Sequence, residues 1–420
     1  MQALRHRPLN LLVARHGKHV FRLISDHRID PDAAAAGRAA PDLVVLPCHR
    51  DFLGAAAATP EAVWDRVREG RALLVFDGSN EGRIHAPDPG NALHRFAEGL
   101  GIAPTSCVYI TQDRRYLADY RAACAARGVE PMPVLTYDYF ISNLFRAHEQ
   151  DGPEAFEQRR AAFRARADAR ERRFINLNLT PRPSKMLFLL SLVRDELWGE
   201  GFISFSGFDK ARHPRALKLK PLLAAMREMP GFEDLVEQLT PCFRRLATLG
   251  PVELGAVERL PGEPQAIRAP VLDTPMPQHD RSWFTVVTET EMTCARVTEK
   301  PFRALLNFHP IVMFGAHGAL RLIEEFGFQT FHGYVDQSYD AEPDARRRFD
   351  RAYAEVRRLC ALGEAELRRL ELASAETLEF NAHWGLTRAP RIYREERNVR
   401  LVDDLIGLWR GLPGAAEARD

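Results

Sequence analysis

Short apolar runs and amphipathic stretches alternate along the first 150 residues of the chain. Five runs of strand length end in polar or turn residues: LNLLVA, DLVVLP, ALLVFDG, CVYITQD and PVLTYD. Between them, EAVWDRVREG, ALHRFAEGLG and YLADYRAACAARG place apolar side chains at helical spacing and end near glycine. Strands that alternate with helices favour a parallel sheet with helices on its faces. The pattern predicts an α/β domain in this half.

A second alternating series follows the arginine-rich stretch PEAFEQRRAAFRARADARERR, which predicts a long exposed helix joining two halves. It runs through RRFINLNLT, KMLFLLSLVRDELW and GFISFSG. A proline-rich stretch without periodicity, 251–280, predicts a long loop. The series resumes with SWFTVVTET, the strand PIVMFG, the helix ALRLIEEFG and the short strand FQTF. We therefore predict an α/β protein with domains at 1–165 and 166–385 and a carboxyl-terminal segment at 386–420.

Composition and charge narrow the class of protein. A chain of 420 residues fits two domains, and 58 Lys and Arg against 57 Asp and Glu argue against a dedicated nucleic-acid binder. Local basic clusters remain available for an anionic small ligand. The six cysteines include no CxxC pair, which favours buried thiols in a reducing compartment over a metal site. Neither a signal peptide nor an apolar run of membrane-spanning length is present, so we expect a soluble, cytoplasmic protein.

The motif Thr298-Glu299-Lys300 opens an apolar helix. Thr298 is placed to cap the helix with its hydroxyl, and Pro301 fits the first turn, where a missing N–H costs nothing. A helix amino terminus with a lysine beside it is a ready anion site. The alternative is an ordinary capped helix with a surface Glu–Lys pair.

A glycine-containing turn follows in PIVMFGAHGALRLIEEFG, where Gly315 ends a strand and Gly318 begins a helix. Glycines in a strand-to-helix turn let backbone N–H groups approach a phosphate closely, although many α/β turns use glycine only for packing. Two neighbouring helix amino termini at the carboxyl edge of one sheet favour a ligand site there.

The stretch SWFTVVTETEMTCARVTEKPFRALLNFHPIVMFGAHGALRLIEEFGFQTFHGYVDQSYD resembles the donor-binding half of GT-B glycosyltransferases. It is most similar to the α1,3-fucosyltransferases and to related bacterial and phage proteins with a TEK motif. The resemblance covers about 170–350 and is specific mainly over 283–340. It implies two Rossmann-like domains that face each other across a cleft, with the acceptor side in the amino-terminal half. It also implies that the carboxyl-terminal segment can cross back to that half.

The resemblance assigns donor contacts residue by residue. Glu299 would accept hydrogen bonds from ribose or sugar hydroxyls, Lys300 would contact the diphosphate, and Glu289 in VVTET would face the donor. Arg182, with Lys185 behind it, would stabilise the charge that builds on the leaving diphosphate. The alternative for this PRPSK stretch is a basic turn with solvated side chains. With Thr298, Gly315 and Gly318, these residues form the predicted donor site.

The DQSYD stretch offers Asp336 and Asp340, with Gln337 where related bacterial sequences usually carry an acid. These residues could form a metal pair, but the fold implied by the resemblance usually works without a metal. We therefore interpret DQSYD as a turn that caps a helix, and we expect no metal and no cofactor apart from the donor itself.

The catalytic base is expected in the amino-terminal half, because an inverting transferase needs a group that takes the proton of the acceptor hydroxyl. The first candidate is Glu81, in the loop that follows the strand ALLVFDG. The second is Asp77, near the end of that strand. His85 lies in the same loop, and His49 and Asp51 follow the preceding strand.

The sequence thus predicts a glycosyltransferase, of hexosyl or fucosyl type, that moves a sugar from a nucleotide-diphosphate donor to a hydroxyl of a glycan or related acceptor. Its reaction would be inverting and metal-independent, as in polysaccharide biosynthesis. The alternative is a non-catalytic GT-B-like protein that binds nucleotide or glycan. A hydrolase or dehydrogenase is disfavoured, because G-x-S-x-G and a G-x-G-x-x-G after the first strand are both absent.

Overall fold

The computed structural model describes residues 10–13, 42–48, 52–79, 82–149, 151–166, 170–252, 254 and 277–415. The chain forms two compact units. Unit 1 comprises Met1–Asn143 and Arg391–Asp420, and unit 2 comprises Leu144–Pro390. The boundaries expected from the sequence lie at 165 and 385. The main difference is the arginine-rich helix α7 (Gly152–Arg164), which belongs to unit 2.

Unit 1 contains a five-stranded sheet in the order β1-β2-β3-β4-β5, and all its strand pairs are parallel. The strands are β1 (Asn10–Val13), β2 (Asp42–Pro47), β3 (Ala72–Gly78), β4 (Cys107–Thr111) and β5 (Val134–Thr136). Every side chain of β2, β3 and β4 is buried, because helices cover both faces of the sheet. The helices of this region are α2 (Phe52–Ala57), α3 (Glu61–Arg68), α4 (Ala92–Gly99), α5 (Tyr116–Arg127) and α6 (Tyr139–Ala147), which crosses the unit boundary.

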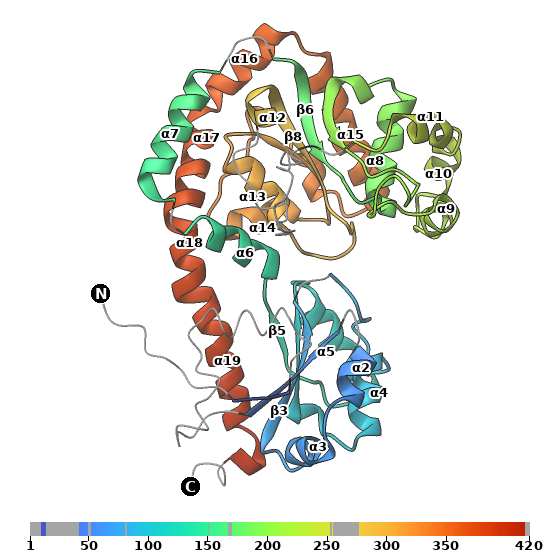
Figure 1. The fold of residues 1–420 in the computed structure, drawn as a ribbon, viewed down its shortest axis with the longest axis vertical. Coiled ribbons are helices and arrows are strands. Elements are labelled where there is room, and N and C mark those ends of the chain that lie inside the picture. The colour runs from blue at the N-terminus through green and yellow to red at the C-terminus, as the bar shows by residue number, and fades with distance from the viewer. Residues whose placement is uncertain are drawn as a thin grey trace. The chain divides into compact units, whose positions relative to one another are not determined.

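The carboxyl-terminal helix α19 (Asn398–Arg410) packs on the sheet of unit 1, as Figure 1 shows. Leu405 and Trp409 join the core cluster formed by the apolar side chains of the strands. The Trp409 indole Nε1 donates a hydrogen bond to the Arg71 carbonyl, 3.0 Å away. The end of the chain therefore completes the core of the domain that its beginning forms.

Unit 2 contains a four-stranded sheet in the order β7-β6-β8-β9, again entirely parallel. The strands are β6 (Arg172–Leu177), β7 (Gly201–Ser204), β8 (Ser282–Thr288) and β9 (Ile311–Phe314). The helices are α7, α8 (Pro183–Arg194), α9 (Leu219–Arg227), α10 (Glu233–Leu239), α11 (Cys242–Leu249), α12 (Pro277–Asp280), α13 (Glu299–Leu305), α14 (Ala319–Glu325), α15 (Ala345–Ala361), α16 (Glu364–Ala373), α17 (Ala375–His383) and α18 (Ala389–Ile392), which crosses the unit boundary. The predicted α/β class, with a parallel Rossmann-like sheet in each half, is confirmed.

The FQTF stretch is not a strand, so that prediction is wrong. Its backbone is held by side chains instead. Gln329 donates its N–H to Asn381 Oδ1 at 2.8 Å, and Asn381 Nδ2 donates to the Gln329 carbonyl at 2.9 Å. Phe331 donates its N–H to Gln337 Oε1 at 2.8 Å. An amide side chain thus takes the hydrogen-bonding place of a neighbouring strand.

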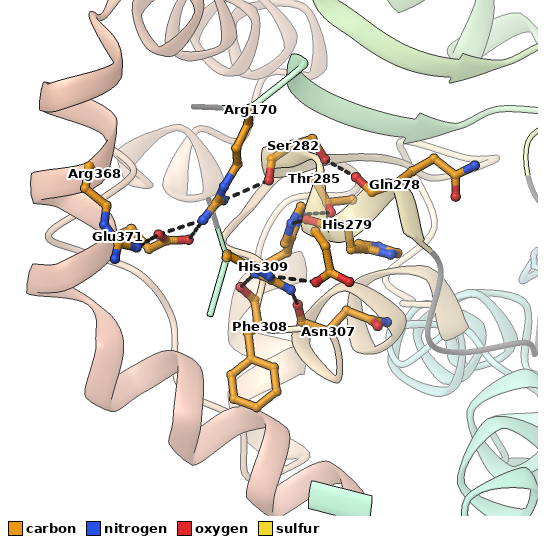
Figure 2. Close-up of polar contacts among 12 residues, drawn as sticks. Arg170, Gln278, His279, Ser282, Thr285, Asn307, Phe308, His309, Arg368 and Glu371 are labelled. Atoms are coloured by element: carbon orange, nitrogen blue, oxygen red, sulfur yellow. Dashed lines mark hydrogen bonds and ion pairs between the residues drawn. The ribbon is translucent and has the colours of Figure 1, made fainter. Parts of the chain in front are cut away.

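A buried ion cluster lies at the amino end of the unit 2 sheet (Figure 2). Arg170 donates to both carboxylate oxygens of Glu371, at 2.6 and 2.7 Å, and to the Ser282 carbonyl at 2.9 Å. Its guanidinium lies 4.1 Å from the ring centroid of Trp283. Arg368 also donates to Glu371, at 2.7 Å. The side chains of Arg170 and Glu371 are 0% and 1% exposed, so each depends on the other for its charge balance.

The same region holds the carboxyl end of α13. Arg166 donates to the Asn307 carbonyl at 2.7 Å and to the Phe308 carbonyl at 3.3 Å, and it pairs with Asp280 at 2.8 Å. These carbonyls belong to the turn that directly follows α13, and a cation near a helix carboxyl end offsets the negative end of the helix dipole. The helix that opens with the TEK motif is therefore anchored at its far end.

His309 joins this anchor to β8 and α12 (Figure 2). Its Nε2 lies 2.5 Å from the His279 carbonyl and its Nδ1 lies 3.0 Å from Thr285 Oγ1. A carbonyl only accepts hydrogen bonds, so Nε2 carries the hydrogen and Nδ1 accepts from the threonine. Complete burial lowers the pKa of His309 well below its usual value, and the imidazole is neutral.

Candidate functional site

The candidate site is built at the carboxyl edge of the unit 2 sheet. Because all four strands are parallel, their carboxyl ends lie at one edge, where ligands bind in open α/β sheets. The helix α8 begins at this edge after β6, and α13 begins there after β8. The predicted donor-site residues thus come from two neighbouring connections.

Glu289 organises the TEK motif. Its carboxylate accepts hydrogen bonds from the Thr298 backbone N–H (2.9 Å), the Thr298 hydroxyl (2.9 and 3.0 Å) and the Lys300 ammonium (2.9 Å). The expected cap is wrong, because the Thr298 hydroxyl makes no side-chain cap bond to α13 and binds the carboxylate instead. The hydroxyl is the donor in this charge-assisted hydrogen bond. The lysine of the motif likewise pairs with Glu289, 11 residues earlier in the chain, and not with its neighbour Glu299.

The Glu289 carboxylate is charged despite its burial. Its side chain is 1% exposed, and desolvation alone would raise its pKa. The charges of Lys300 and Arg296 and the hydrogen bonds from Lys300 and Thr298 outweigh this, so that the pKa of Glu289 lies below its usual value. Glu289 therefore fixes the position of the Lys300 ammonium, whose side chain remains 20% exposed.

Lys185 is the unusual group of this site. It lies in the first turn of α8, is 6% exposed, and forms no hydrogen bond or ion pair with any residue in the described ranges. Burial lowers its pKa to about 7, and the nearby charge of Lys300 adds to this effect. Glu289 and Glu299 act in the opposite direction. A buried ammonium without an acceptor destabilises the fold, so we infer that an anion is its missing partner.

The lowered pKa of Lys185 predicts a pH-dependent stability. The unfolded chain holds this proton up to about pH 10.5 and the folded chain only to about pH 7. Between these values the unfolded state binds more protons, so the contribution of Lys185 to stability rises with pH, by up to about 1.4 kcal/mol per pH unit. Denaturant unfolding at pH 7, 8 and 9 should show this slope in the parent and not in Lys185→Met. Lys220→Met, at an exposed lysine of the same unit, should keep the slope. Parallel pH curves for the parent and Lys185→Met would contradict the assignment.

Arg182 and Glu299 complete the rim of the site. Arg182 is exposed at the position that precedes the first turn of α8, and Glu299 is 7% exposed at the start of α13. Both act electrostatically on Lys185. The Ser184 hydroxyl donates to the carbonyls of Glu289 and Thr290, at 3.1 and 2.7 Å, so it ties α8 to the β8 connection and does not cap the helix.

The second predicted helix end is occupied by the protein itself. Leu320 at the start of α14 donates its N–H to Asp340 Oδ2 at 3.1 Å, and Gly318 donates its N–H to the Asp340 carbonyl at 3.1 Å. Asp340 thus supplies the anion that a helix amino terminus attracts. The DQSYD stretch is the capping turn that the sequence predicts, because Asp336 also accepts the Ser338 N–H at 3.0 Å.

The two glycines of this turn have local structural reasons. Gly318 has a φ of 75°, in the left-handed region that side chains other than glycine rarely adopt. A Cβ on Gly315 would lie 3.2 Å from both the Ala319 Cβ and the Met313 methyl. Among the described residues, Asp340 therefore caps the amino end of α14, whereas the amino end of α8 carries Lys185, which has no ion-pair partner there.

Two further polar groups at this edge were missed by sequence reasoning. Asn178 follows β6, is 0% exposed, and accepts the Thr288 hydroxyl through Oδ1, while its Nδ2 has no partner among the described residues. The Ser206 hydroxyl, after β7, is also buried and has no hydrogen-bond partner in the described part of the chain. Their signal in the sequence is a polar residue directly after an apolar strand.

In unit 1 the candidate bases are only partly described. Asp77 is 1% exposed, and its Oδ1 accepts the N–H of Ser79 at 3.0 Å and its hydroxyl at 2.6 Å, which shapes the turn after β3. His85 is partly buried against Tyr109, and burial lowers its pKa. Glu81, His49 and Asp51 lie outside the described residues.

No group of three or more His, Cys, Asp or Glu side chains in the described ranges could hold a metal ion. No helix there is both long and apolar enough to cross a membrane.

Comparison with known proteins gives only distant likenesses. No family model matches the chain, and no curated protein matches it. Similar solved structures include Anabaena Alr3699/HepE in complex with UDP and glucose, at 13% identity, 96% coverage of this chain, 100% of that chain and a TM-score of 0.42. Another is α,α-trehalose 6-phosphate synthase from Burkholderia multivorans, at 11% identity and a TM-score of 0.35. The match covers 94% of this chain and 78% of that chain. At these scores neither structure establishes a family or an activity for this chain.

Proposed function

We propose that the chain is a glycosyltransferase that binds a nucleoside-diphosphate sugar at the carboxyl edge of the unit 2 sheet. It would transfer the sugar to a hydroxyl of a glycan or related acceptor. The observation that carries this proposal is Lys185, a buried and unpartnered cation at the amino end of α8, beside the oriented ammonium of Lys300.

A diphosphate fits this charge distribution. Lys185 and Lys300 would bind its oxygens, the dipole of the 12-residue helix α8 would add to the attraction, and Arg182 would reach it from the rim. The same groups would stabilise the negative charge that builds on the diphosphate as it leaves. A diphosphate would also give Lys185 the acceptor that its burial requires.

The carboxylates would divide their roles. The oxygens of Glu289 are engaged by Thr298 and Lys300, so we propose that Glu289 positions Lys300. Glu299 is then the group that accepts hydrogen bonds from hydroxyls of the donor. Glu81 remains the proposed base of an inverting reaction. Asp77 accepts hydrogen bonds from Ser79, so we propose that it shapes the loop.

Thermal unfolding with a panel of nucleoside diphosphates tests the site. UDP, GDP, ADP and CDP would each be compared with the matching nucleoside, in excess EDTA. At least one diphosphate should raise the unfolding temperature, because a ligand at 100 times its Kd stabilises the folded state by about 2.7 kcal/mol. The nucleosides should not raise the unfolding temperature. EDTA should not remove the shift that a diphosphate causes, because the helix end and the side-chain cations take the place of a metal ion. A panel without any shift, or a shift that needs added manganese, would contradict this proposal.

Catalysis is distinguished from simple binding by slow donor hydrolysis. A transferase without acceptor is expected to release sugar from the nucleotide sugar whose diphosphate binds. Binding with no hydrolysis and no transfer would support the alternative, a GT-B-like protein that only binds nucleotide or glycan.

A further inference from the structure

Residues 208–220, here called the basic segment, run from the connection after β7 into the first turn of α9 in unit 2. They contain five exposed cations and one carboxylate, Asp209. The five are Lys210, Arg212, Arg215, Lys218 and Lys220. Asp209 is engaged in a turn, because its Oδ1 accepts the Ala211 N–H at 2.9 Å. The segment therefore presents a concentrated positive charge.

None of these five side chains forms an ion pair with a residue that the structure describes. Some other surface arginines of unit 2 are paired: Arg346 contacts Asp234 and Asp350, and Arg281 contacts Glu171. Like charges that are held together repel and raise the free energy of the folded state. An anionic molecule that binds to the segment would lower this repulsion.

The basic segment is a folded loop. The N–H groups of Arg212 and His213 both donate to the Asp209 carbonyl at 3.1 Å, and Ala216, which is 0% exposed, donates to the His213 carbonyl at 3.0 Å. The Phe208 ring packs 5.8 Å from that of Phe243. The charged side chains therefore extend from a backbone that is already ordered, so that less entropy is lost when a partner binds.

Lysine usage singles out the same region. The chain has only six lysines, and Lys18 lies outside the described residues. Lys185 and Lys300 belong to the candidate donor site, and the remaining three are in the basic segment. Apart from Lys300 with Glu289, the ion pairs described above use arginine, whereas the ammonium of lysine is a compact charge on a flexible stem.

The basic segment borders the candidate donor site. Ser206, just before it, donates its N–H to the Leu179 carbonyl at 2.8 Å, so the connections after β7 and β6 run side by side. The connection after β6 carries Arg182 and leads into α8. An anionic chain bound to the basic segment would lie next to the site where a sugar is transferred.

We propose that the basic segment binds the acceptor, and that this acceptor is an acidic glycan, a saccharide chain bearing carboxylate, sulfate or phosphate groups. This inference rests on the proposed function. A lipid surface fits less well, because Phe208 is packed inward and only Leu219, at 37% exposure, is a large exposed apolar residue of the segment. Nucleic acid fits less well because the segment offers no exposed phenylalanine, tyrosine or tryptophan on which bases could stack.

The test uses the full chain and its Arg215→Gln/Lys218→Gln/Lys220→Gln variant. The matched control is Arg321→Gln/Arg357→Gln/Arg369→Gln, which removes three exposed cations of unit 2 outside the segment. The probes are a sulfated heparin hexasaccharide, neutral maltohexaose, phosphatidylglycerol vesicles and a DNA duplex at low salt. The segment variant should bind the hexasaccharide at least about tenfold more weakly than the parent, and the control should not. The difference should vanish near 1 M salt, where the Debye length is about 3 Å.

Equal hexasaccharide binding by parent and segment variant would overturn the proposal. So would a parent that binds vesicles or DNA through the segment but not the hexasaccharide. UDP and GDP affinities are measured on the same samples and should agree within about twofold between parent and segment variant. If none of the four diphosphates of the panel, UDP, GDP, ADP and CDP, binds the parent, the proposed function fails, whatever the hexasaccharide does.

Discussion

Replacing Glu371 by glutamine is expected to lower the free energy of unfolding of unit 2 by about 3–5 kcal/mol. Glu371 accepts three hydrogen bonds from Arg170 and Arg368, and its side chain is 1% exposed. The amide keeps the size of the side chain and removes its charge. The Arg170 guanidinium, 0% exposed, is then left as an uncompensated buried cation. Urea unfolding followed by the fluorescence of the neighbouring Trp283 measures the loss.

Two controls separate the buried charge from other effects of the Glu371 substitution. Glu157→Gln removes a carboxylate that is 61% exposed and paired with Arg160, and should cost at most about 1 kcal/mol. Arg170→Met/Glu371→Leu removes both buried charges and should cost less than Glu371→Gln alone. If Glu371→Gln unfolds like the parent, the cluster does not hold the amino end of the sheet.

The double variant Lys185→Met/Lys300→Met is expected to bind nucleoside diphosphates about 10²–10⁴-fold more weakly than the parent. A hydrogen bond to a charged group contributes roughly 1.5–3 kcal/mol, and two are removed. Each single variant should lose about half of this free energy. Methionine keeps most of the length and apolar volume of lysine, so the fold should survive. Titration calorimetry with the diphosphate that gives the largest thermal shift measures the loss.

The control for this variant removes two exposed cations of the same unit, Arg321→Met/Arg369→Met. It should leave the affinity within about twofold. The donor-site assignment is wrong if the lysine variant binds diphosphates as tightly as this control. A second consequence concerns stability, because Lys185→Met alone should unfold at a higher temperature than the parent near pH 7.

The alternation of apolar runs and amphipathic stretches was sufficient to predict both parallel sheets. Strands such as β3 and β8, buried along their whole length, read as continuous apolar runs because helices cover both faces. The FQTF stretch has the same local pattern, yet its hydrogen bonds come from Asn381, which lies 52 residues along the chain from Gln329. No local pattern encodes a partner so far away.

The sequence could not predict which unit contains α7, for a similar reason. A charged helix between two domains carries no local signal of the domain on which it packs. Stacking of Phe156 and Phe163 on Phe308, at 6.1 and 4.7 Å between ring centroids, assigns it to unit 2. Only the tertiary structure brings these three rings together.

The sequence predicted which residues lie at the candidate site better than it predicted their hydrogen-bond and ion-pair partners. The TEK motif and PRPSK stretch do meet at one sheet edge, as strand order implies. The pairing of Lys300 with Glu289 and the cap of α14 by Asp340 depend on how loops return, which spacing does not determine. The burial of Lys185 could not be predicted from the sequence either, because PRPSK has the composition of a solvated turn.

The burial of Lys185 also has a consequence for how this protein would evolve or be engineered. A residue that destabilises the empty protein persists only while its ligand matters to the cell. Selection of a library for heat resistance alone should therefore enrich Met or Leu at position 185, and such clones would be robust and inactive. Copies of the gene that have lost their biological role should drift in the same direction. An ammonium kept at this position in a set of homologues would mark the members that still use the site.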